Sequence, residues 1–195
     1  MTGKHLRAAL AAAVAAASLL AADLVSSQAS AATYAADPAS SRLEFTGVQA
    51  GAPFKAVFHQ FSAAVDLDPG ALASARIEVT IDMKSVESGD KDRDDTMRGA
   101  DIFDVAHNPT AHYVTRSVTR TASGFSAIGA LTLRGVTKDV PIEFKLSSVA
   151  GGATLIGTAD LKRLDFGVGR GDWKNTDWVA DAVKVAFSLN LKPKT

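Results

Sequence analysis

The stretch RIEVTIDM, residues 76–83, decides the fold class of this chain. Its apolar side chains alternate strictly with polar ones, so that Ile77, Val79, Ile81 and Met83 share one parity. Successive side chains of a β-strand point to opposite faces, and this segment therefore predicts a strand with one dry and one wet face. Such strands are typical of antiparallel sheets.

The same alternation recurs about eight times along the chain. Turn signals such as Asp68-Pro69-Gly70 and Gly151-Gly152 separate most of the runs. The pattern predicts an all-β antiparallel meander, either closed into a barrel or folded as a sandwich. We favour an eight-stranded up-and-down barrel, because closure leaves no edge strand unpaired. The predicted strands are residues 42–48, 54–67, 76–83, 111–119, 125–134, 140–146, 153–164 and 183–191.

The inward-facing side chains follow from the parity of each strand. An eight-stranded barrel has room either for packed side chains or for one small ligand, and periodicity does not decide between them. Small residues such as Gly129 and Gly157 among the inner set leave space for a void. The large residues of the inner set are Leu43, Phe45, Phe58, Phe61, Ile77, Val79, Ile81, Met83, Tyr113, Phe125, Leu131, Leu133, Ile142, Phe144, Leu155, Val185 and Phe187.

One long run changes parity. Phe58 and Phe61 lie on opposite parities of residues 54–67. One extra residue near His59-Gln60, a β-bulge, would return both to one face. In residues 111–119 we expect Thr115 and Ser117 to share the inner face with Tyr113.

Two stretches lack the alternation. Residues 85–109 are highly charged, and we expect a short helix over residues 90–98 with acids near its positive N-terminal end. Residues 164–180 are rich in glycine yet carry Trp173 and Trp178. Aromatic side chains on such a loop are better explained by covering an apolar surface than by solvent exposure.

The composition excludes several classes of protein. The chain has 195 residues, no cysteine, and 21 basic against 21 acidic side chains. Without cysteine there is no disulfide framework, thiol nucleophile or iron–sulfur cluster. The charge balance argues against a nucleic-acid-binding protein, which needs a basic face to meet phosphates.

The first residues have the pattern of a secretory signal. Lys4 and Arg7 precede an uncharged run over residues 8–22, and Ala29-Ser30-Ala31 supplies small residues for cleavage. The run is shorter than the roughly 20 residues that span a bilayer. We therefore expect cleavage after Ala31, one mature domain over residues 32–195, and a periplasmic or secreted location.

The mature chain offers little recognisable chemistry. The sequence patterns of serine hydrolases, zinc peptidases and phosphate-binding loops are absent. Its histidines, His59, His107 and His112, lack a common zinc spacing. We expect no metal site and no cofactor other than a bound lipid.

Two other classes of function remain open. One is an acid/base enzyme that uses Asp82, Asp94 or Asp165, which requires carboxylates that converge in a pocket. The other is an interaction module that docks a membrane or redox partner through the loop bearing Trp173 and Trp178.

Taken in order, several short motifs resemble the YceI-like family of exported polyisoprenoid-binding proteins. The resemblance covers essentially the whole mature chain. The motifs are Tyr34-Ala35-Ala36-Asp37-Pro38, Leu43-Glu44-Phe45, Asp66-Leu67-Asp68-Pro69, Ile81-Asp82-Met83-Lys84-Ser85-Val86, Arg93-Asp94, Asp101-Ile102-Phe103-Asp104, Asn108-Pro109, Gly129-Ala130-Leu131-Thr132-Leu133-Arg134-Gly135-Val136-Thr137 and Arg163-Leu164-Asp165-Phe166-Gly167-Val168-Gly169.

The resemblance implies a lipocalin-like eight-stranded barrel, closed in part by the helical segment after the third strand. It also implies an elongated cavity for a long apolar molecule such as a polyisoprenoid, an isoprenoid quinone or a fatty amide. No catalytic residues are carried over from the family. A transient contact with a membrane or a membrane protein, and a homodimer, stay open.

We expect a binding protein or carrier rather than an enzyme. Aromatic and aliphatic side chains would form the cavity wall, Trp173 and Trp178 a lid, and Arg93 or Thr115 would lie near the ligand head group. The predicted ligand-binding residues are Phe45, Phe58, Met83, Arg93, Met97, Phe103, Tyr113, Thr115, Phe125, Leu131, Phe144, Trp173 and Trp178.

Overall fold

The computed structural model describes residues 33–194. The predicted signal peptide and its cleavage after Ala31 lie outside these residues. Within them, no helix has the length and apolar character needed to span a membrane.

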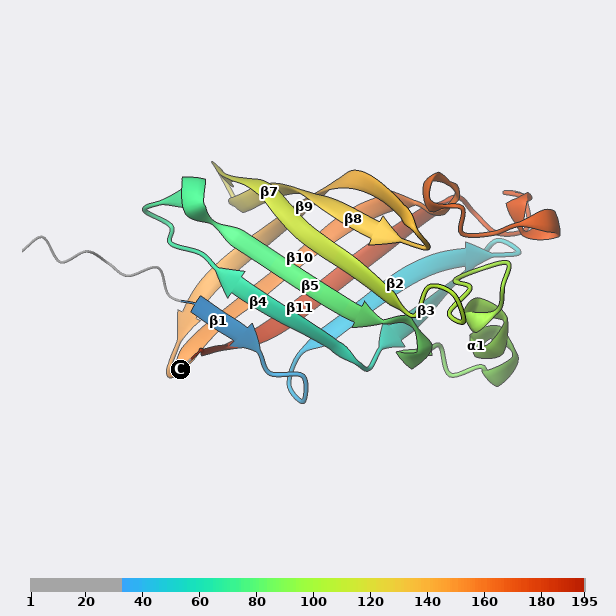
Figure 1. Ribbon diagram of the computed structural model, residues 1–195, viewed down its shortest axis with the longest axis horizontal. Coiled ribbons are helices and arrows are strands. Elements are labelled where there is room, and N and C mark those ends of the chain that lie inside the picture. The colour runs from blue at the N-terminus through green and yellow to red at the C-terminus, as the bar shows by residue number, and fades with distance from the viewer. Residues whose placement is uncertain (1–32, 195) are drawn as a thin grey trace, which may run out of the picture.

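Antiparallel strands dominate the described chain (Figure 1). One α-helix of eight residues, α1, lies between the sixth and seventh strands. The strands are β1 (Thr33–Ala36), β2 (Arg42–Gln49), β3 (Ala52–Phe58), β4 (Phe61–Asp66), β5 (Arg76–Asp82), β6 (Val86–Glu87), β7 (Thr110–Thr121), β8 (Gly124–Leu133), β9 (Val136–Val149), β10 (Gly152–Lys162) and β11 (Ala182–Pro193). The helices are α1 (Lys91–Arg98) and four short 3-10 helices, η1 (Leu72–Ser74), η2 (Met83–Ser85), η3 (Arg163–Phe166) and η4 (Gly171–Lys174).

The sheet closes on itself through β11. The C-terminal half of β11 pairs with β1, in the register Tyr34 to Pro193, and its N-terminal half pairs with β2, in the register Phe45 to Val185. β1 and β2 thus occupy one position in the barrel, both paired with β11, and β4 and β3, which pair with β1 and β2 respectively, occupy the next position. With β5 and β7 to β11 they form the predicted eight-stranded up-and-down barrel, and the short β6 extends the edge of β3.

The prediction of a β-bulge at His59-Gln60 was wrong, because the strand is interrupted at these residues. The strand breaks there: β3 ends at Phe58, β4 begins at Phe61, and both phenylalanines are buried. The break lets β3 and β4 turn the same face inward. It is held to η2, because the His59 N–H donates to the Ser85 carbonyl at 3.2 Å.

The bulge of this barrel lies in β7. The register with β8 moves from Thr115 opposite Gly129 to Ser117 opposite Ile128, which leaves one extra residue in β7. Val118 is therefore buried and Ser117 exposed, contrary to the expectation that Ser117 faces inward.

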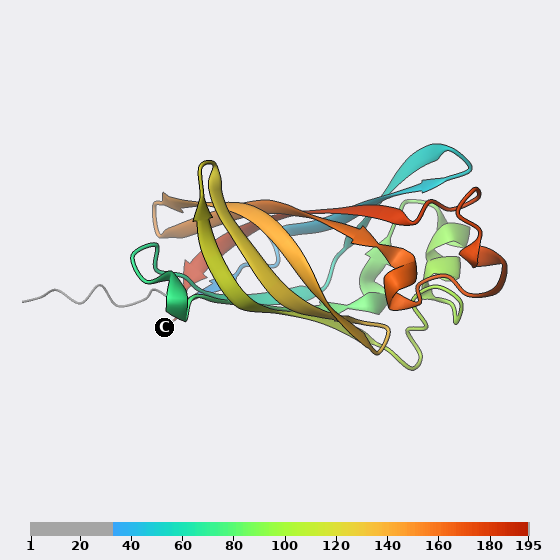
Figure 2. The same ribbon diagram turned by 90° about the horizontal axis from the view of Figure 1, so that it is seen from above.

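The charged segment after β6 forms the expected helix. Asp90 is the N-cap of α1, and its carboxylate accepts the Arg93 N–H at 3.1 Å. Viewed from above, α1 lies at the same end of the barrel as the loop between β10 and β11 and the hairpin of β2 and β3 (Figure 2).

The other end of the barrel is packed with side chains. Phe125 and Phe144 stack there with ring centroids 5.4 Å apart, and Val65 and Leu155 have almost no exposed surface. The barrel is therefore solid at one end, which leaves any open lumen at the end where α1 lies.

Candidate functional site

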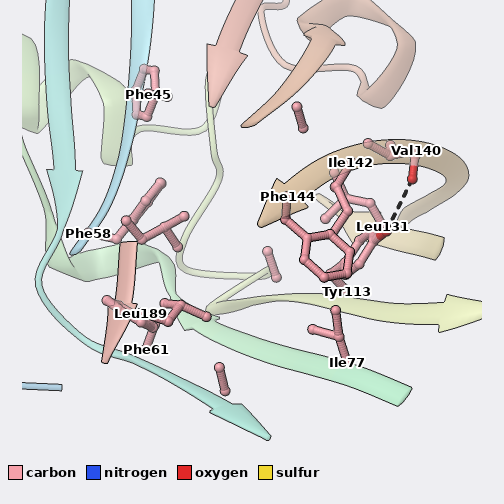
Figure 3. Close-up of a cluster of buried hydrophobic side chains, with 14 of the residues drawn as sticks. Phe45, Phe58, Phe61, Ile77, Tyr113, Leu131, Val140, Ile142, Phe144 and Leu189 are labelled. Atoms are coloured by element: carbon pink, nitrogen blue, oxygen red, sulfur yellow. Dashed lines mark hydrogen bonds between the residues drawn. The ribbon is translucent and has the colours of Figure 1, made fainter. Parts of the chain in front are cut away.

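A cavity of about 450 Å³ occupies the barrel on the side of α1. This volume falls within the range of roughly 300–1,000 Å³ that is usual for small-molecule sites. Its wall is made mainly of aliphatic and aromatic side chains, which come from the strands and from the helical segments and loops at the α1 end, and Figure 3 draws several of them. The lining residues are Leu43, Phe45, Gly47, Gln49, Phe54, Phe58, Phe61, Ile77, Val79, Ile81, Met83, Asp90, Asp92, Arg93, Thr96, Met97, Ile102, Phe103, Ala111, Tyr113, Leu131, Leu133, Val140, Ile142, Ala159, Leu161, Arg163, Phe166, Val168, Trp173, Val179, Ala180, Val183, Val185, Phe187 and Leu189.

Several side chains of the inner face are only partly buried. Val79, Ile81, Val185 and Phe187 point into the lumen, yet each keeps accessible surface. In a filled core, inward-facing residues of this kind lose nearly all of their surface. Their remaining surface means that the barrel's own side chains leave the lumen unfilled.

Aromatic rings form one side of the wall. The ring of Phe45 packs against Phe58 at 5.8 Å, Phe103 at 6.2 Å and Phe54 at 6.1 Å between centroids. Phe103 reaches this group from the loop after α1, so it ties the helical segment to β2 and β3. Sequence reasoning included Phe45, Phe58 and Phe103 but missed Phe54, although the parity of Phe54 matched that of Phe58.

The cavity opens beside the start of α1. Asp90 and Asp92 are the lining residues that are exposed to solvent, and Arg93 lies next to them. The Arg93 guanidinium carbon lies 4.8 Å from the centroid of the Phe54 ring, a cation–π contact across the mouth. Gln49, at the end of β2, completes this side of the mouth.

Two buried arginines hold the loops around the mouth. The three guanidinium nitrogens of Arg163 donate to the carbonyls of Ala180, Val168 and Val179 at 3.1, 2.9 and 2.7 Å. Burial lowers the pKa of Arg163, and the charge of Asp181 partly opposes this effect. These bonds tie together the two ends of the loop between β10 and β11.

Arg134 does the same for the loop after α1. It donates to the carbonyls of Ile102 and Ala100 at 2.6 and 2.5 Å. The two loops also meet, because the N–H groups of Gly169 and Arg170 both donate to the Asp101 carbonyl at 2.9 Å. Sequence reasoning missed Arg134 and Arg163, since their role depends on carbonyls far along the chain.

Tyr113 places a polar atom deep in the cavity. Its hydroxyl donates to the Val140 carbonyl at 3.3 Å, the bond drawn in Figure 3. Burial raises the pKa of this hydroxyl well above its ordinary value, with a smaller effect from the charge of Asp139. The group therefore stays neutral, and Gly129 beneath it leaves room for the ring.

Nine of the thirteen predicted ligand-binding residues line this cavity, namely Phe45, Phe58, Met83, Arg93, Met97, Phe103, Tyr113, Leu131 and Trp173. The four that do not are Thr115, Phe125, Phe144 and Trp178. Phe125 and Phe144 lie in the packed end. The Thr115 hydroxyl accepts the Ile77 N–H at 2.8 Å and is buried there, away from any head group at the mouth. Trp178 is 51% exposed, so only Trp173 of the expected lid reaches the cavity.

The aspartates considered for acid/base catalysis do not line the cavity. Asp94 is buried and accepts bonds from the N–H and hydroxyl of Ser88, both at 2.7 Å. The Asp82 carboxylate accepts the Lys84 N–H at 2.9 Å, and Asp165 is half-exposed, 3.6 Å from Lys138. Within residues 33–194, no three histidine or acidic side chains gather in a way that could hold a metal ion.

Comparison with known proteins identifies the family of this chain. The sequence profile of the YceI-like domain matches residues 34–191. A UPF0312 protein of Pseudomonas aeruginosa (strain LESB58) is 34% identical over an alignment of 117 residues that covers 57% of this chain and 61% of the relative. The match thus spans less than two thirds of that relative's length.

Solved structures share the architecture. Burkholderia cenocepacia BcnA superposes with a TM-score of 0.75 at 33% identity, covering 79% of this chain and 98% of the other. A polyisoprenoid-binding domain from Saccharophagus degradans superposes with a TM-score of 0.64 at 16% identity, covering 83% of this chain and 98% of the other. The second likeness shows the fold alone.

Proposed function

The chain belongs to the YceI-like family, and we propose that it is a binding protein that holds a long apolar molecule inside its barrel. The observation that carries this proposal is the cavity of about 450 Å³ whose inward-facing side chains remain partly accessible. An apolar guest would cover that surface and complete the interior.

A chain of isoprene units suits this cavity. The wall offers hydrocarbon contacts along its length, and each methylene removed from water contributes about 0.8 kcal/mol. About ten buried carbons would give roughly 8 kcal/mol before the cost of association is subtracted. Tight binding therefore needs few polar contacts, in keeping with the few polar groups of the wall. A polyisoprenoid, an isoprenoid quinone and a fatty amide all meet this requirement.

The mouth favours tail-first entry. Its polar groups, Asp90, Asp92, Arg93 and Gln49, lie at the open end, and the other end is packed. A tail would run along the aromatic wall toward Ile77 and Ile142, and a polar head would stay beside α1. The bonds made by Arg163 and Arg134 favour a mouth that is formed before the ligand arrives.

We further propose that the protein works outside the cytoplasm, as its signal-like N-terminal sequence predicts. A carrier in an aqueous compartment between membranes would shield such a molecule from water during storage or transfer. Catalysis plays no part in this proposal.

The two tryptophans of the chain provide the test. In Trp178→Phe the remaining Trp173 lines the cavity, whereas in Trp173→Phe the remaining Trp178 lies outside it. Delipidated protein would be titrated with menaquinone-4, a quinone with a prenyl tail that quenches tryptophan emission. We expect saturable quenching in Trp178→Phe and little in Trp173→Phe.

Native mass spectrometry of protein purified from its own host provides the second readout. We expect a mass that lacks residues 1–31 and an additional bound lipid. Protein that takes up no menaquinone-4 and is isolated without any lipid would contradict the proposed function.

A further inference from the structure

The guanidinium of Arg93 has hydrogen-bond donors at the mouth of the cavity that could bind a ligand head group. Its Nε lies 3.4 Å from Oε1 of Gln49, at the outer limit of a hydrogen bond. Its closest approach to a carboxylate is 3.7 Å, from Nη2 to Oδ2 of Asp90, which is too long for a hydrogen bond. A guanidinium carries five N–H donors, so within residues 33–194 most of those on Arg93 have no protein acceptor.

The second arginine of the wall differs in this respect. All three nitrogens of Arg163 donate to backbone carbonyls, so that side chain serves the loop. Arg93 is instead held by the face of the Phe54 ring, which fixes the position of the cation without using its in-plane donors. The geometry leaves those donors available to a guest.

The charges around Arg93 restrict what that guest can be. Asp90 and Asp92 line the same mouth, whereas Lys91 is bound to Asp95 on another face of α1. At the mouth itself, one cation thus stands beside two carboxylates, while the charge of Arg163 deeper in the wall is opposed by Asp181. A phosphate or diphosphate would add negative charge beside both, and repulsion between like charges opposes this. A neutral carbonyl oxygen could accept from Arg93 without that repulsion.

We infer that the mouth selects a neutral, hydrogen-bond-accepting head group and disfavours a phosphorylated one, with Arg93 as the specificity-determining donor and Asp90 and Asp92 as the discriminating charges. This inference rests on the proposed function, since it names the head of the molecule whose tail fills the barrel.

The test compares three prenyl compounds that differ in the head. These are geranylgeranyl acetate, with a carbonyl acceptor, geranylgeranyl diphosphate, and squalene, which has no head group. Each would displace menaquinone-4 from the Trp178→Phe protein, with the emission of Trp173 as the signal. We expect the acetate to bind at least tenfold more tightly than the diphosphate.

Substitutions at the mouth test which side chains cause the preference for the acetate over the diphosphate. Arg93→Met should weaken the acetate about tenfold, as loss of a hydrogen bond from a charged donor predicts, and should leave squalene within about twofold. Asp90→Asn with Asp92→Asn should strengthen the diphosphate about tenfold, because it removes the two repelling charges. Asparagine keeps the N-cap of α1, so the helix should persist.

A matched control lies at the packed end. The Arg120 guanidinium lies over the Phe125 ring at 5.1 Å, a similar pair outside the cavity. Arg120→Met should change the affinity of none of the three compounds.

The outcomes separate the two proposals. If all three compounds bind with the same affinity in the parent protein and in every variant, the head-group inference is wrong and the carrier proposal stands. If none of them binds, squalene included, the proposed function is wrong and the inference falls with it.

Discussion

Replacing Ala159 by leucine tests whether the lumen is hollow. Ala159 lies on β10 opposite Val185, is 8% exposed, and lines the cavity. Leucine adds three carbons, and at about 0.8 kcal/mol for each buried methylene it should raise the free energy of unfolding of ligand-free protein by about 2 kcal/mol. For a domain of this size that is a rise in Tm of roughly 4–8 °C.

The same substitution should weaken ligand binding. The leucine side chain takes the place of about three tail carbons, so the affinity should fall by about 2 kcal/mol, or roughly 30- to 50-fold in Kd. Stability and affinity thus change in opposite directions. The assays are thermal unfolding of delipidated protein and titration with menaquinone-4.

The control is the same change on the outer face. Ala186 lies on β11 between Val185 and Phe187, which line the cavity, so its own side chain points outward. Ala186→Leu should leave the affinity unchanged. If Ala159→Leu instead lowers the free energy of unfolding by about 1–3 kcal/mol, as overpacking of a filled core does, and binding is unaffected, the lumen is filled and not hollow.

Two further predictions concern the cavity wall and the outer surface. Gly129→Ala should lower the free energy of unfolding by about 1–3 kcal/mol, because the added Cβ would overlap the Tyr113 ring. Combining it with Tyr113→Val should recover part of that loss in a double-mutant cycle. Strictly additive effects of the two substitutions would contradict this account. Glu44 accepts from Arg42 and Lys55 at 2.7 and 3.0 Å, and these bonds lower its pKa below the ordinary 4.5. Its stabilising effect is therefore present above about pH 4.5 and is lost as the pH falls through the lowered pKa, so Glu44→Gln should cost about 0.5 kcal/mol at pH 7 and progressively less below pH 4.5 in urea unfolding. A cost that is the same at pH 7 and pH 3 would contradict the assignment.

The candidate site could be predicted in part from local pattern. Phe45, Phe58 and Tyr113 were assigned to the lumen by parity, and their place in the wall follows directly from it. Phe125 and Phe144 have the same parity and the same chemistry, yet they fill the packed end. Parity gives the face of a strand and not the height along the barrel, which depends on the register and tilt of every neighbour.

The local features of the fold could be predicted from the amino-acid sequence. A period of two in residues 76–83 requires a two-faced strand, Asp90 supplies an N-cap, and turn residues separate eight such strands. These features depend on backbone geometry within a few residues, so they can be predicted without knowing which segments pair.

The position of the hollow part of the barrel and the shape of its mouth depend on contacts between segments that are far apart in the sequence. Pairing between distant segments sets the break after Phe58 and the bulge in β7. It also sets which carbonyls Arg134 and Arg163 bind. The volume left inside the barrel is the small difference between the space that eight strands enclose and the side chains that enter it. That difference exists only once all the strands are in register.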